Sequence, residues 1–257
     1  GGRTSGWNRW PCGPRLKRRP LGGQVDPRKL FVDERLIGSC VYCGAEPDSR
    51  DHVPSKVLLD DPVPADLPVV EACASCNGGF SLDEEYLACF LECVIAGSTD
   101  PASLSREKIK SILARKIDLT ARIQACCRRG EDGRLTWEPE ERRVRNVVLK
   151  LARGHAAFEL SLPQIDDADE LQILPLAVMS DVERDVFENA RSGEFRGWPE
   201  VGSRALMRAC GARPYANQDG PWVVVQRDRY RYTVDQHGGV RVQLVLSEYL
   251  ACTVNWS

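Results

Sequence analysis

The sequence lacks long apolar runs and carries no strong excess of charge. No apolar stretch approaches the ~20 residues that a helix needs to cross a bilayer, and the N-terminus lacks the apolar segment of a secretory signal. The formal net charge is −2 over 257 residues, so bulk charge indicates no class of partner. The apolar fraction of 42% is ordinary for a globular protein. These features favour a cytoplasmic, globular chain.

Cysteine is abundant, yet its pattern does not indicate a secreted disulfide scaffold. The chain holds 11 cysteines, an odd number, and four of them fall into metal-ligand spacing. This usage favours a reducing, intracellular setting. The other seven are interpreted as buried or incidental thiols, and Cys89 and Cys93, four residues apart, are predicted to share the core face of a helix.

Two Cys-x2-Cys pairs bracket an Asp-His dipeptide. The pairs are Cys40 with Cys43 and Cys73 with Cys76. Four thiolates suit one structural Zn²⁺ ion, because zinc takes four ligands in a tetrahedron. A thioredoxin-like redox pair is the competing interpretation, but it is disfavoured because there are two pairs and neither lies in a βαβ pattern.

Charge divides the first 157 residues into three parts. Residues 1–39 carry nine Lys and Arg against three Asp and Glu, and residues 40–100 carry two against twelve. Residues 101–157 carry fourteen against seven. An acidic centre with basic flanks suits a metal site with phosphate-binding flanks, although solvated helix faces explain the charge pattern alone more simply.

The predicted organisation has a basic arm, a zinc module and a larger C-terminal region. Residues 1–29 are interpreted as a disordered arm, 30–100 as the zinc-containing module, and 101–257 as helices followed by an antiparallel sheet of undetermined role. The fold class is therefore α+β.

The expected elements follow from caps and periodicity. In the module we expect a short strand at 69–70 and a helix that begins at Leu82, with Ser81 as its cap. Further helices are expected over 104–128, 142–160 with an interruption at Gly154, and 181–189, capped by Ser180. Strands are expected over 222–225, 230–234, 240–246 and 250–256.

The cysteine pairs, the Asp51-His52-Val53-Pro54 segment and Asn77 directly after Cys76 together resemble the HNH (His-Asn-His) endonuclease family. The resemblance is to its zinc-stabilised branch, which has a treble-clef-like ββα-metal core. It implies an endonuclease that hydrolyses phosphodiester bonds of DNA, with RNA as an alternative substrate.

The resemblance also implies a role for each residue of this set. His52 would be the general base that activates water, since an imidazole with a pKa near ~6.5 suits proton abstraction at neutral pH. Asp51 and Asn77 would hold one catalytic Mg²⁺ or Mn²⁺ through oxygen atoms. Neighbouring residues of a strand point to opposite faces, but in a twisted hairpin next to a metal both Asp51 and His52 can reach one phosphate.

One part of the family pattern is missing. The middle Asn, which usually precedes the third cysteine and braces the catalytic loop, has no counterpart where Leu67 and Pro68 stand, and Asp66 is the nearest polar residue. Two alternatives to the nuclease therefore stay open. One is a zinc-dependent nucleic-acid-binding module without catalysis, and the other is a structural zinc protein that binds a protein partner.

Overall fold

The computed structural model describes residues 38–131, 133, 135–189, 199–201, 203–211, 217–236 and 238–257. The basic arm predicted at 1–29 lies outside these residues. The helices are α1 (Ala74–Ala96), α2 (Glu107–Arg115), α3 (Ile117–Ala125), α4 (Glu141–Leu160), α5 (Asp181–Glu188) and α6 (Arg204–Ala209). The strands are β1 (Ser49–His52), β2 (Val69–Ala72), β3 (Cys127–Arg129), β4 (Leu135–Trp137), β5 (Glu170–Pro175), β6 (Gln218–Asp219), β7 (Trp222–Gln226), β8 (Tyr230–Gln236), β9 (Val240–Leu246) and β10 (Leu250–Trp256).

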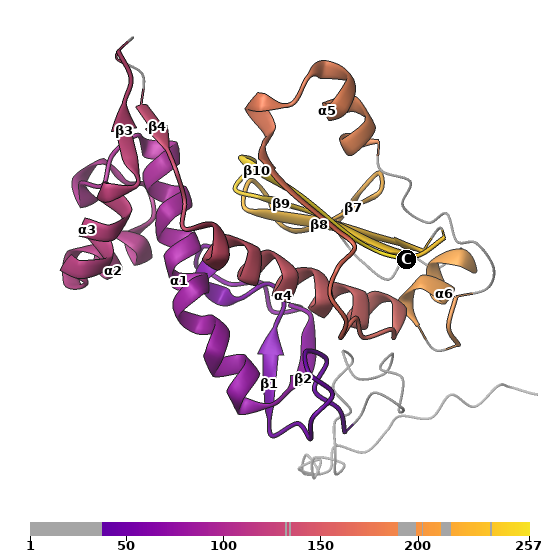
Figure 1. Cartoon of the computed structure of the whole chain (residues 1–257). Coiled ribbons are helices and arrows are strands. Elements are labelled where there is room, and N and C mark those ends of the chain that lie inside the picture. Colours follow the sequence, from indigo (N-terminus) through magenta and orange to yellow (C-terminus); the bar gives the residue numbers. More distant parts are fainter. Residues whose placement is uncertain are drawn as a thin grey trace, which may run out of the picture.

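The fold class is α+β, as predicted. Strands β1 and β2 form an antiparallel pair that leads directly into α1, so the zinc module has the order strand, strand, helix. Helix α4 lies between this module and the C-terminal sheet, as Figure 1 shows. Buried side chains of the module, of α4 and of the sheet belong to one continuous core.

Helix α1 begins earlier than predicted. It starts at Ala74 rather than at Leu82, and Cys73 is its N-cap. The predicted cap, Ser81, instead lies within the helix and donates its hydroxyl hydrogen bond to the carbonyl of Gly78. At the observed start, the N–H of Cys76 donates to the Cys73 sulfur and the N–H of Ala74 donates to the Asp48 carboxylate. Cys89 and Cys93 are fully buried on α1, which confirms their predicted core positions.

The helix predicted over 104–128 is wrong in its extent. The backbone breaks at Lys116, which separates α2 from α3, and the last residues of the range enter β3. The N-cap of α2 is Arg106, and the preceding Ser105 donates from its hydroxyl and its backbone N–H to Glu92. Helix α4 instead runs without interruption through Gly154.

The C-terminal sheet is six-stranded and antiparallel, with the order β5-β10-β9-β8-β7-β6. The four predicted strands are confirmed as β7 to β10, whereas β5 and β6 were not predicted. The capping box of Ser180 is confirmed at the start of α5. Helices α4 and α5 lie on opposite sides of the sheet in Figure 1. Among the described residues, no helix is long and apolar enough to span a membrane.

Gly154 allows α4 to approach the segment that follows β1. A Cβ at this position would lie 2.7 Å from Cγ2 of Val53 and 3.3 Å from the hydroxyl of Tyr42. Val53 is fully buried and branched at Cβ, so it has little room to yield. The Gly154→Ala substitution should therefore lower the free energy of unfolding by about 1–3 kcal/mol, measured by chemical denaturation.

Gly79→Ala is the matched control for this prediction. Gly79 also lies within a helix, but no atom lies within 4 Å of the position that a Cβ would take there. Alanine should raise stability there by about 0.5–1 kcal/mol, because it restricts the unfolded chain more than glycine does. Equal effects of both substitutions would contradict the close approach of α4.

Candidate metal centre and active site

The four cysteines of the two pairs lie together. The sulfur atoms of Cys40, Cys43, Cys73 and Cys76 are all within 4.8 Å of one another, and none is joined in a disulfide. Sulfur atoms of Cys43 and Cys73 are 3.8 Å apart. Four thiolates at this spacing can hold one structural metal ion such as zinc, which prefers a closed tetrahedral sulfur site.

Two local features shape the cluster. After Cys40 the chain forms a turn. The N–H of Cys40 donates to the carbonyl of Ala45 at 2.7 Å, and the N–H of Gly44 donates to the carbonyl of Cys40 at 2.8 Å. Gly44 has a φ of 75°, a left-handed conformation that glycine adopts without strain. The turn brings the first two sulfur atoms to the same side, towards the start of α1.

The second feature is the start of α1. The N–H of Cys76 donates to the Cys73 sulfur at 3.4 Å, and the N–H of Ala74 donates to the carboxylate of Asp48. The backbone hydrogen bond from Cys76 lowers the pKa of the Cys73 thiol, whereas burial raises the pKa of the Cys76 thiol. A bound metal would favour the thiolate at both positions, because it carries the largest local charge.

His52 is the last residue of β1, and its backbone lies opposite Val69 of β2. Its side chain is half-buried on the outer face of the strand pair, the face that also carries Arg50 and Glu71. Nε of Arg50 lies 3.5 Å from the Glu71 carboxylate. The structure therefore places the predicted general base at a strand end with access to solvent.

Asp51 points to the opposite, inner face. Its Oδ2 accepts a hydrogen bond from the hydroxyl of Tyr42 at 2.7 Å and lies 2.7 Å from Nζ of Lys150. The neighbouring carboxylate and burial raise the pKa of Tyr42 well above its usual range, burial being the larger cause. Because an ammonium already neutralises Asp51, the carboxylate does not fit the predicted role of a magnesium ligand.

Asn77 was predicted to lie before the helix, but it lies in the first turn of α1. Its amide nitrogen donates to the carbonyl of Arg50 at 3.2 Å and lies 3.4 Å from the hydroxyl of Ser49. Asn77 therefore holds β1 from the side of the helix. This contact differs from the metal-ligand role that the resemblance implies for Asn77.

Sequence reasoning missed Tyr42, Glu84, Lys150 and Gly154 as neighbours of the site. None of the four was given a role in the site. Lys150 is 95 residues from Ser55 and 66 from Glu84, its hydrogen-bond partners. One feature of the sequence pointed to these neighbours, namely Gly154 within a helical pattern. A glycine inside a helix, away from its ends, indicates that another segment packs closely against the helix there.

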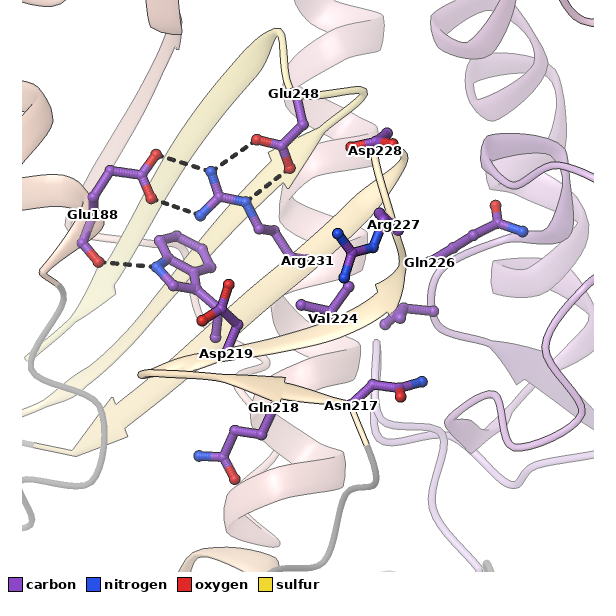
Figure 2. Close-up of a pocket in the computed structure, with 12 residues that line it drawn as sticks. Glu188, Asn217, Gln218, Asp219, Val224, Gln226, Arg227, Asp228, Arg231 and Glu248 are labelled. Carbon is purple, nitrogen blue, oxygen red and sulfur yellow. Dashed lines mark hydrogen bonds and ion pairs between the residues drawn. The ribbon is translucent and has the colours of Figure 1, made fainter.

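A separate cavity of about 770 Å³ lies at the β6–β7 end of the C-terminal sheet. Figure 2 shows the Arg231 guanidinium between the carboxylates of Glu188 and Glu248. The same guanidinium lies 4.4 Å from the centre of the Trp222 ring. These contacts fasten the end of α5 to the sheet, and no described residue of the zinc module lines the cavity.

Removal of one cluster thiol should remove the metal. Cys73→Ser replaces a thiolate by a hydroxyl that zinc binds poorly, so the zinc content should fall from about one ion per chain towards zero, with a lower melting temperature. Elemental analysis and thermal unfolding measure both. Zinc should also dissociate as the pH falls, because protons compete with the metal for the thiolates.

Cys127→Ser is the control, because Cys127 is also partly exposed but lies outside the cluster. This variant should keep its zinc. Full zinc content in the Cys73→Ser protein, or equal loss in both proteins, would refute the four-thiolate site.

Comparisons with protein-family models, with curated proteins and with solved structures found no match for the chain. The relation to HNH nucleases therefore remains a resemblance of motif.

Proposed function

We propose that the chain is a metal-dependent HNH-type endonuclease that hydrolyses phosphodiester bonds in DNA, with His52 as its general base. The observation that carries the proposal is the position of His52. It ends the first strand of a strand-strand-helix unit, and the four-thiol cluster joins the turn before that strand to the start of the helix. This agrees with the order of elements that the resemblance implies.

The proposed chemistry needs a base beside an accessible phosphate. His52 would take a proton from water, and the resulting hydroxide would attack phosphorus as the bond to the 3′ oxygen breaks. The leaving 3′ oxygen would take up a proton from solvent, so the products would carry 5′-phosphate and 3′-hydroxyl ends. Asn77 supports this role because its hydrogen bond to the Arg50 carbonyl fixes the strand that carries the imidazole.

The divalent cation remains a prediction from the resemblance. Mg²⁺ or Mn²⁺ would stabilise the charge that develops on the leaving oxygen. The resemblance implies Asp51 and Asn77 as its ligands, but in the structure Asp51 contacts Lys150 and the Asn77 amide donates to the Arg50 carbonyl. No step of the proposal depends on a particular ligand set.

The acidity of residues 40–100 opposes the approach of DNA less than the formal charge count implies. Many of its carboxylates pair with cations from the module or from other parts of the fold: Asp51 and Glu84 with Lys150, Asp60 with Arg106 and Arg229, Glu71 with Arg50, Asp83 with Arg143, and Glu85 with Lys116. Such pairing reduces the charge that an approaching phosphate backbone meets. Binding should still weaken steeply with salt.

A second candidate is a zinc-dependent nucleic-acid-binding module without catalysis. Two observations favour it: the engagement of Asp51 with Lys150, and the lack of any Asn between Val53 and Pro68. This candidate predicts salt-sensitive DNA binding that does not lead to cleavage in Mg²⁺ or Mn²⁺.

Cleavage of supercoiled plasmid by the zinc-loaded protein in Mg²⁺ or Mn²⁺ separates the two candidates. We expect wild type to cut, and His52→Ala to cut at least about 100-fold more slowly, because the general base is removed. The His52→Ala protein should keep its zinc and its melting temperature, since the imidazole is not part of the four-thiol cluster.

The matched control is Gln124→Ala, an exposed position on α3. It should cut as fast as wild type. Undiminished cutting by His52→Ala would refute the assigned base, and DNA binding by wild type without any cutting would favour the second candidate.

A further inference from the structure

The inner face of β1 borders a cage of oxygen atoms around one buried ammonium. Lys150 of α4 is 1% exposed, and its Nζ lies 2.7 Å from Oδ2 of Asp51 and 3.1 Å from Oγ of Ser55. The carboxylate of Glu84 on α1 makes a third contact with the same nitrogen. The oxygen atoms therefore come from a strand, from the segment after it and from a helix.

The oxygen atoms of the cage favour a cation. Asp51 and Glu84 are 5% and 6% exposed, and two buried carboxylates on one nitrogen would repel each other strongly without a positive charge between them. Carboxylate and hydroxyl oxygens are also the ligands that hard divalent cations prefer. The same oxygen set could therefore be neutralised by an ammonium or by a metal ion.

The fold delivers the ammonium to this position. Gly154 lies one helical turn after Lys150, and it allows α4 to pack against Val53 and Tyr42. The hydroxyl of Tyr42 then shares Oδ2 of Asp51 with the ammonium. Phe80 completes the surroundings, with its ring centre 5.8 Å from Nζ.

We propose that Lys150 is the resident cation of this cage and takes the place of a divalent ion on Asp51. In this arrangement Asp51 is a positioning residue: it anchors β1 from the inner face, while the adjacent His52 lies on the outer face. The catalytic consequence rests on the proposed nuclease function, whereas the occupancy of the cage by Lys150 does not.

Manganese binding tests the occupancy without any measurement of cleavage. The zinc-loaded full chain is titrated with Mn²⁺, and the loss of the free-ion electron paramagnetic resonance signal reports binding. We expect Asp51→Asn to leave the Mn²⁺ affinity of the wild-type sequence unchanged. A loss of about tenfold or more in that variant, the size expected when a metal ligand is lost, would overturn the proposal.

Removal of the ammonium should convert the cage into a metal site. Lys150→Ala leaves Asp51, Glu84 and Ser55 around an open space, so Mn²⁺ should bind at least about tenfold more tightly than to wild type and raise the melting temperature. Adding Glu84→Gln should abolish the gain. Equal Mn²⁺ affinity in wild type and folded Lys150→Ala would overturn the proposal.

Lys116→Ala is the matched control, because Lys116 pairs at 2.6 Å with Glu85 on the same helix as Glu84 but is half exposed. It should gain no Mn²⁺ affinity. If Lys150→Ala does not fold, the comparison of wild type with Asp51→Asn decides the question alone, since both keep Lys150.

The positioning role has its own kinetic signature. Cleavage by Lys150→Ala is measured at the cation concentration of the standard assay, with no extra Mn²⁺. The kcat should fall about tenfold or more, because the imidazole is misplaced. The KM for plasmid should stay near the wild-type value, because the DNA-binding surface is intact. A change in KM alone would refute that role. Absence of cleavage by wild type would refute the proposed function, whereas the Mn²⁺ titration would still decide the occupancy of the cage.

Discussion

The contact between Lys150 and the carboxylates of Asp51 and Glu84 joins the parts of this structure that lie far apart in the sequence. It ties α4 to the strand that carries His52 and to α1, and α4 in turn packs against the C-terminal sheet. Removal of either partner of a buried ion pair strands the other charge in a low-dielectric interior. The zinc module is therefore not an independent folding unit, because α4 packs against its inner face.

The four-thiol cluster and the buried ion pair act on opposite ends of the same short strand. The cluster joins the turn before β1 to the start of α1, and the ion pair holds the last part of β1 to α4. Asn77 adds a third contact through the Arg50 carbonyl. Three restraints therefore hold the backbone of a strand of only four residues, the last of which is His52.

Local patterns predicted the parts of the fold that depend on local physics. The four cysteines were assigned from spacing, and the alternating strands β7 to β10 from their period of two, because neither depends on distant contacts. The role of Asp51 could not be read this way. Strand alternation places Asp51 and His52 on opposite faces of β1. The partner of Asp51, however, is Lys150 of α4, which is distant in the sequence. The start of α1 was mistaken because a capping pattern at Ser81 is equally regular in sequence.

The central claim is that the His52 imidazole acts as a base at a hydrolytic site held by a four-thiolate metal cluster. Chemical rescue tests it most directly: plasmid cleavage by zinc-loaded His52→Ala is measured with increasing free imidazole. The account predicts that imidazole restores cleavage in proportion to its unprotonated fraction, since the lost group is a proton acceptor at a half-exposed position. Cleavage by the variant at the wild-type rate without imidazole would contradict it.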